Sequence, residues 1–332
     1  MSINAWTSRG IVCLLGLSAI AAPISSTIAQ TPATSRPEAT AEEVVVTAQR
    51  IGIPVWRVTG PRTTIVLVGS IGRVTPGTRW DPSALDVALA RADRIMFPEA
   101  MDVSFGLFSV IGLIGKWRAQ ASLPKGQTLQ AMTTPDQWAR LVALRDQGIL
   151  KPGFERVHPY HLAMTLGRLT RDRRKYETGA DGYVRRYLRK HGEKEVPLAQ
   201  GNLKDLTAEF FSSAPRAHVA CLMEAVTLVE AGEAGAQARA AARDARSTAW
   251  AARRVPDALK AKPEGGQRSC WPKGSRMEQV REASLSPAIR DLMGGSQVTL
   301  AVLTLETLAK PGGVLDDLAA AGFDVRGPRW KR

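Results

Sequence analysis

The chain has 332 residues and a formal net charge of +14, with 44% hydrophobic and 23% charged residues. This length suits one large domain or two smaller ones that can bury a hydrophobic core, and the composition is that of a globular protein. The positive charge is scattered, with local clusters at 171–175 and 185–190, and no aromatic ladder or zinc-ligand spacing accompanies it. We therefore expect a solvated basic surface and no binding of nucleic acid.

Residues 1–29 have the pattern of a secretory signal peptide. Arg9 is the only charged residue among them, an apolar run follows from 11 to 22, and small residues at Thr27 and Ala29 precede Gln30. The apolar run is too short to span a bilayer as a stable anchor. We expect cleavage between Ala29 and Gln30, export to the periplasm, and no membrane-spanning segment in the mature protein.

Residues 30–50 are predicted to form a disordered linker because they are small, polar and interrupted by proline. The linker ends in the β-prone stretch VVVTAQR, which resembles the docking segment near the mature start of TonB-dependent outer-membrane receptors. Such segments add a strand to a sheet of the partner protein. The alternative is a first edge strand or plain linker.

The folded domain is expected to cover 51–332, with an α/β (α+β) fold. Alternating and continuous apolar runs predict strands, and apolar residues at helical spacing predict helices. Strands are predicted at 53–58, 63–69, 94–100, 195–200, 296–307 and 323–328, and helices at 81–94, 135–147, 159–169, 180–191, 275–293 and 312–322, with two or three long helices within 202–254. The order predicts a central mixed β-sheet from N- and C-terminal β-α units and a large, mainly helical middle.

Two cysteines remain after removal of the signal peptide, Cys221 and Cys270. An even number in an exported chain favours a disulfide, and the alternative is two buried thiols. Neither cysteine belongs to a metal-binding or redox-active spacing.

Four stretches of the chain carry a resemblance when they are taken in order. They are PVWRV followed by a strand ending in Gly69-Ser70-Ile71-Gly72, then ALARADRIMFPEA with Glu99, then GADGYVRRYLRKHGEKEVPLAQ, and finally TLETLAKPGGVLDDLAAAGFDV. From about Ile53 to Pro328 the chain resembles the TraB/GumN family, whose animal relatives are the Tiki proteins.

The resemblance also exposes two departures. It implies a histidine at each of two positions where this chain has Gly72 and Thr307, with Thr304 in place of a glycine. Tiki-like members are thought to place these histidines and a glutamate, matched here by Glu99, around a divalent metal. Glycine has no donor atom and threonine is a poor ligand for transition metals, so the resemblance implies ligand loops at Gly69, Ser70, Gly72 and Thr307 around a degenerate metal-hydrolase site.

Two carboxylates offer a different chemistry. Glu99 and Glu306 are each predicted at a strand end, and on neighbouring strands they could form an acid–base pair. The alternative is that Glu99 is a structural acceptor for loop amides and Glu306 is solvated. Ser70 lacks the Gly-x-Ser-x-Gly elbow of a serine nucleophile.

The four histidines supply one possible metal pair. His158 and His161 have a spacing that can place two ligands on one helix face, although Pro159 starts that helix and leaves His158 at its edge. His191 is expected at a helix end, where a cation is favourable, and His218 at a helix surface or in the core.

These observations favour a binding or envelope-associated role over enzyme activity, with no cofactor expected. An envelope protein or an anionic polymer is the expected class of partner. The alternative is an active Tiki-like metal-dependent hydrolase or peptidase with a rearranged site, and only this alternative requires a divalent metal.

The signal peptide leads to a direct prediction. In a Gram-negative host, the mature protein should begin near Gln30, because cleavage follows the small residues that end at Ala29. N-terminal sequencing of the periplasmic fraction tests this. Recovery of full-length protein in the cytoplasm alone would contradict it.

Overall fold

The computed structural model describes residues 52–61, 63–101, 112, 115–201, 203–263, 270–271, 275 and 285–331. The predicted signal peptide, the linker at 30–50 and the VVVTAQR stretch lie outside the described residues. Within the described residues, no helix is both long and apolar enough to cross a membrane.

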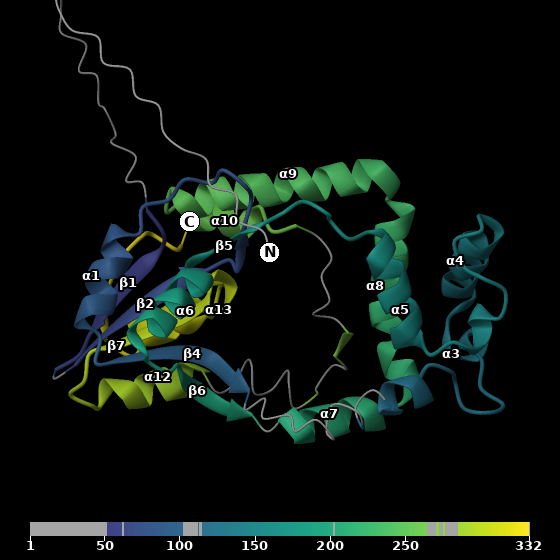
Figure 1. Cartoon of the computed structure of the whole chain (residues 1–332), viewed down its shortest axis with the longest axis horizontal. Coiled ribbons are helices and arrows are strands. Elements are labelled where there is room, and N and C mark those ends of the chain that lie inside the picture. The colour runs from purple at the N-terminus through teal and green to yellow at the C-terminus, as the bar shows by residue number, and fades with distance from the viewer. Residues whose placement is uncertain are drawn as a thin grey trace, which may run out of the picture. The chain divides into compact units, whose positions relative to one another are not determined.

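A six-stranded mixed sheet forms the centre of the fold, as predicted (Figure 1). Its strands in spatial order are β6 (Val196–Gly201), β4 (Arg94–Met101), β7 (Thr299–Thr304), β2 (Thr64–Ser70), β1 (Val55–Thr59) and β8 (Asp324–Arg326). The four strands from β6 to β2 run parallel, whereas β1 is antiparallel to both β2 and β8. The parallel strands β2 and β7 are almost entirely buried, which explains their continuous apolar sequences.

The register between β2 and β7 brings together two segments that are far apart in the sequence. Ser70 pairs with Thr304 at the carboxyl end of these neighbouring strands. The loop that follows β2 therefore begins beside the turn that follows β7, although more than 200 residues separate them in the sequence. A short second sheet, β3 (Arg73–Val74) with β5 (Glu177–Thr178), lies directly after the β2 loop.

Helices pack against the large sheet and form the first of two hydrophobic cores with it. They are α1 (Ser83–Arg91), α6 (Ala180–His191), the carboxyl half of α9 (Gly232–Ala251), α10 (Val255–Lys260), α12 (Leu285–Met293), α13 (Leu305–Ala309) and α14 (Val314–Ala320). The indole rings of Trp56 and Trp250 are fully buried in this core.

The helical middle of the chain has its own core. It contains side chains from α3 (Leu129–Met132), α4 (Pro135–Asp146), the short helix η1 (Phe154–Arg156), α5 (Pro159–Leu169) and α8 (Val219–Glu230). Helix α7 (Leu203–Ser212) and the short helix η2 (Pro215–His218) precede α8, which passes through Ala231 into α9. Figure 1 shows α5 and α8 side by side, with α9 continuing from α8. The predicted disulfide between Cys221 and Cys270 is present in this core.

The most consequential error of the sequence prediction concerns the last long strand. The predicted strand ran to Thr307, but β7 ends at Thr304, and the side chain of Thr304 accepts a hydrogen bond from the amide of Thr307 at 3.2 Å. Threonine at this position caps a helix, because its hydroxyl satisfies a free amide of the first turn. Glu306 therefore lies in the first turn of α13 and does not end a strand.

The disulfide should contribute measurably to stability. Cys221 and Cys270 are separated by 49 residues, and in the chain-entropy model closing such a loop stabilises the folded state by about 4 kcal/mol. A Cys221→Ala, Cys270→Ala variant should lose much of this in urea unfolding, and reductant should not destabilise it further. Mass spectrometry after alkylation without reductant should find neither wild-type thiol labelled, and labelling of both would contradict the bridge.

Candidate functional site

The loop after β2 is held by the start of α6. The hydroxyl of Ser70 donates to Asp181 Oδ1 at 2.8 Å and accepts from the amide of Gly72 at 3.0 Å. The amide of Gly179 donates to the carbonyl of Gly72 at 3.0 Å, and a Cβ on Gly179 would come within 3.1 Å of that carbonyl oxygen. The GAD sequence at 179–181 is therefore a docking point for the GSIG loop. Ser70, only 4% exposed, is occupied by these contacts.

The turn after β7 is closed by its own threonines. The hydroxyls of Thr304 and Thr307 lie 2.8 Å apart, and Thr304 also caps α13. Glu306 connects this turn to α9. Its carboxylate accepts a hydrogen bond from Arg246 Nη2.

The carboxyl half of α9 lies over both loops and fixes them. The indole of Trp250 donates to the carbonyl of Gly69 at 2.7 Å, and the hydroxyl of Ser247 accepts from the amide of Thr75 at 3.1 Å. The side chains of Arg246 and Glu306 are only 10% and 16% exposed, so their ion pair is largely removed from water. Arg246 Nη1 is buried and has no hydrogen-bond partner among the described residues.

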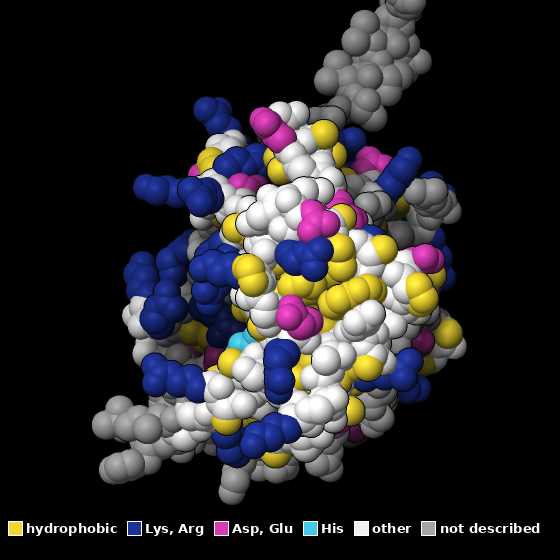
Figure 2. Space-filling model, turned by 90° about the vertical axis from the view of Figure 1, so that its right-hand side faces the viewer, with side chains coloured by type: hydrophobic (Ala, Val, Ile, Leu, Met, Phe, Trp, Pro, Cys, Tyr) yellow, Lys and Arg dark blue, Asp and Glu magenta, His cyan; other side chains and the backbone are white. Residues whose placement is uncertain are grey.

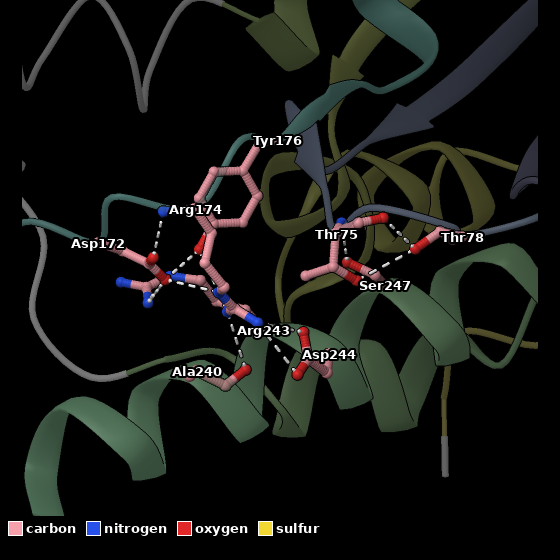
Figure 3. Close-up of polar contacts among 9 residues, drawn as sticks. All are labelled: Thr75, Thr78, Asp172, Arg174, Tyr176, Ala240, Arg243, Asp244 and Ser247. Carbon is pink, nitrogen blue, oxygen red and sulfur yellow. Dashed lines mark hydrogen bonds and ion pairs between the residues drawn. The ribbon is translucent and has the colours of Figure 1, made fainter.

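Further toward its start, α9 also fastens the segment that leads into β5 (Figure 3). Asp172 accepts hydrogen bonds from Arg174, Arg243 and the hydroxyl of Tyr176, and Arg174 also reaches Asp244 at 3.0 Å. Burial opposes ionisation of Asp172, but the hydrogen bonds from Tyr176 and Arg174 outweigh it and lower its pKa to about 2. These contacts hold the β3–β5 ribbon against α9.

A protein-family model matches most of the chain. The model of the TraB/PrgY/gumN family matches residues 54–327. The chain belongs to this family. Searches of the curated proteins and of the solved structures gave no match. In this TraB/PrgY/gumN protein, the matched region begins at β1 and ends just after β8, so it includes both loops and the helical middle.

The two carboxylates named from the sequence have different surroundings. Strand β4 pairs with β7 through Arg94–Met96, and the backbone of Glu99 lies further along β4, opposite Ala199 of β6. Glu306 is paired with Arg246 in the first turn of α13, so the part of the alternative in which Glu306 is solvated is wrong. Glu306 is not a free general base in the structure, because its carboxylate is paired with Arg246. The role of Glu99 stays a prediction.

The residues at the two loops do not fit the divalent metal that the family resemblance implies. Gly72 has a φ of +75° and offers no donor atom, and the Thr307 hydroxyl is engaged by Thr304. Glu306, the residue before Thr307, carries a charge, but its carboxylate is paired with the guanidinium of Arg246. A cation here would lack imidazole ligands, and the carboxylate of Glu306 is already held by Arg246. Among the residues that the structure describes, no three His, Cys, Asp or Glu side chains are grouped to hold a metal ion.

The histidines of the helical core serve packing in this protein. His158 caps α5, its Nδ1 accepting from the amide of Tyr160 at 3.3 Å, and its ring lies 5.3 Å from that of His218. His218 is 1% exposed and its Nδ1 lies 3.1 Å from the carbonyl of Cys270, which agrees with the core interpretation. The ring of His161 packs edge-on against Trp117. His191 ends α6 and stacks on Tyr187.

Sequence reasoning missed the residues that organise this edge of the sheet, which are Asp181, Arg246 and Trp250. Helix α9 carries several arginines, and no local feature separates Arg246 from the others. The spacing of Arg239, Arg243, Arg246 and Trp250 places all four on one helix face, but it does not say which of the arginines meets a carboxylate. Arg239 and Arg246 are each only 8% exposed on that face.

The buried His158 should make the protein sensitive to acid. Burial first, and then the nearby His218 and His161, lower the pKa of His158 from 6.5 to about 4. As the pH falls, His158 is protonated in the unfolded chain near pH 6.5 and in the folded protein only near pH 4. The free energy of unfolding is therefore highest above pH 6.5 and decreases as the pH falls toward 4. The loss amounts to about 3 kcal/mol.

The variant His158→Asn keeps a capping side chain but has no titrating group. Urea unfolding at several pH values between 7 and 4 should show a shallower loss of stability in this variant than in the wild type. His191→Asn, at an exposed helix end, is the control and should keep the wild-type slope. Equal slopes in all three proteins would show that His158 is not the sensor.

Proposed function

We propose that this protein is an exported, periplasmic member of the TraB/PrgY/gumN family that keeps the family scaffold, has a degenerate metal-hydrolase site, and acts by binding in the cell envelope. The observation that carries this proposal is the ion pair between Arg246 and Glu306. It lies beside Thr307, at the edge of the sheet where the family resemblance implies a metal cation.

A buried guanidinium disfavours a second cation in two ways. It repels the metal directly, and this repulsion is poorly screened because the Arg246 side chain is only 10% exposed. It also occupies the carboxylate of Glu306, which could otherwise contribute a ligand. Arginine remains charged at any physiological pH, so this effect does not titrate away.

The remaining polar groups of the two loops are satisfied by one another. Ser70 is engaged by Asp181 and Gly72, and Thr307 by Thr304. A hydrolase needs polar groups that are directed toward substrate, whereas these groups tie the loops to α6 and α13. Their arrangement supports a packing role for the loops.

The surface supports a partner with negative charge. Arg171, Arg173, Lys175, Arg186 and Arg189 are all exposed, within the two basic clusters. Figure 2 shows Lys and Arg side chains standing out over the left part of the face that it presents. Such a surface attracts acidic polymers or acidic protein faces, and the attraction weakens as salt is added.

Restoring the two histidines tests the degenerate site. The wild type should bind zinc, manganese or cobalt no better than surface carboxylates do. In a Gly72→His, Thr307→His variant, an imidazole is added at each of the two loops, and zinc affinity should rise by at least about 100-fold. A Cβ on Gly72 would meet nothing within 4 Å, so the side chain has room. Calorimetry and elemental analysis measure the change.

The matched control is Gly77→His with Thr307→His. Gly77 has a φ of +77°, against +75° for Gly72, and a Cβ there also meets nothing within 4 Å. Both variants therefore carry the same left-handed strain, about 1 kcal/mol, and the same added residues. Only the Gly72 variant should gain affinity. One equivalent of tightly held metal in the wild type would reject the degenerate site and favour the active hydrolase.

A further inference from the structure

The segment between α5 and β5 is attached to α9 by alternate residues. Figure 1 shows this segment running alongside the helix. Asp172 accepts a hydrogen bond from Arg243 at 3.0 Å, and Arg174 donates to Asp244 at 3.0 Å, both partners being on α9. The hydroxyl of Tyr176 donates to Asp172. These contacts fix the backbone of the segment on the surface of the protein.

The residues between the attachment points are exposed cations. They are Arg171, Arg173 and Lys175, and their side chains make no hydrogen bond or ion pair with any described residue. The alternation separates the residues that attach the segment from the charged residues that are left in solvent. The cations are therefore held on a fixed backbone and remain available to a partner.

The end of α5 adds a further free cation and an apolar side chain. Arg168 and Leu169 are the last two residues of this helix, and both are exposed. Leu169 is 63% exposed, against 51% for Val87 and 38% for Val196, the other exposed large hydrophobic residues of the described chain. The name basic strip is used below for Arg168, Leu169, Arg171, Arg173 and Lys175.

The charge of the basic strip is not cancelled by its neighbours. Residues 168–176 contain five cationic side chains and one carboxylate, that of Asp172, and so carry a net charge of +4. The next residue, Glu177, lowers this to +3, and its carboxylate accepts a hydrogen bond from the amide of Gly77. On α9, the charges of Arg243 and Asp244 cancel each other.

A second group of cations joins the basic strip through β5. Arg186 on α6 donates to Thr178 Oγ1 at 2.5 Å, and Thr178 lies three residues after Lys175. Arg189 and Lys190 are also exposed on α6, three and four residues beyond Arg186. Positions with this spacing share one face of a helix. The positive surface therefore continues from the basic strip onto α6.

We propose that the basic strip binds the surface of an anionic phospholipid membrane, with its cations at the headgroups and Leu169 inserted at the boundary between headgroups and acyl chains. The inference rests on the proposed envelope role and narrows its acidic partner to one class. Cations near an anionic leaflet strengthen binding, and an apolar side chain is buried at this boundary. An acidic polymer has no apolar phase, so it would leave Leu169 in water.

Co-sedimentation of the mature protein with lipid vesicles tests the proposal. The protein should bind phosphatidylcholine vesicles that contain phosphatidylglycerol and not those of phosphatidylcholine alone, and added salt should weaken the binding. Arg171→Gln with Arg173→Gln should lower the affinity by about 25-fold, because each cation near the surface contributes about 5-fold. Leu169→Ala should lower it by about 5-fold and leave the salt dependence unchanged.

Matched controls come from exposed residues outside the basic strip. Arg91→Gln with Arg290→Gln removes the same charge from α1 and α12, so it leaves the net charge of the protein equal to that of the first double variant. Val87→Ala shortens an exposed apolar side chain of α1. Both control variants should keep the wild-type affinity within about 2-fold.

An environment-sensitive dye measures the insertion of residue 169 directly. In a Leu169→Cys variant of the mature protein, the new thiol reacts with the dye because Cys221 and Cys270 are joined in a disulfide. The emission of nitrobenzoxadiazole at this position should shift to shorter wavelength on addition of phosphatidylglycerol vesicles. The same dye in a Val87→Cys variant should show no shift.

Three results would overturn the proposal. The first is no preference for phosphatidylglycerol vesicles. The second is equal weakening in the two double variants, which would show attraction to net charge alone. The third is wild-type affinity in Leu169→Ala with no dye shift at residue 169. The third result would favour an acidic polymer, to be tested with soluble polyphosphate, and would leave the envelope role standing. Binding to neither vesicles nor polyphosphate would contradict both.

Discussion

The hydrogen bond from the indole of Trp250 to the carbonyl of Gly69 fixes the position of α9 on the sheet. Both groups are buried, so neither can exchange this bond for one to water. Gly69 also has to be glycine, because a Cβ there would come within 3.0 Å of the Trp56 ring and 2.9 Å of Leu305. With Trp250 seated in this way, one helix turn brings Arg246 to Glu306 and Ser247 to Thr75.

The edge of the sheet that carries the two loops is therefore a packing joint between α6, α9 and α13. Joints of this kind can be built from apolar residues at lower desolvation cost than from a buried ion pair. Arg246 is also left with a buried Nη1 that no described residue satisfies. At this edge the polar side chains are used to join elements of the fold to one another.

Arginines in α9 and in the turn that follows it make several of the ion pairs of this region. In the middle, Arg243 and Arg246 are paired with carboxylates and hold other elements in place. After the helix has ended, Arg254 pairs with Asp257, and both line a pocket together with Arg253 and Arg329.

The sequence by itself determined the local elements whose signals lie within a few residues. Helices α5 and α6 have the predicted bounds, because Pro159 starts the first and Gly192, with a φ of +70°, ends the second. The mixed sheet and the disulfide followed from buried strand patterns and from an even number of cysteines in a chain with a predicted export signal. Only the tertiary structure decided that Ser70 lies opposite Thr304, that Arg246 and not another arginine of α9 meets Glu306, and that Arg253 and Arg329 share a pocket. These contacts join residues 60 to 234 positions apart, and their partners are chosen by sheet register and helix rotation, which local periodicity does not encode.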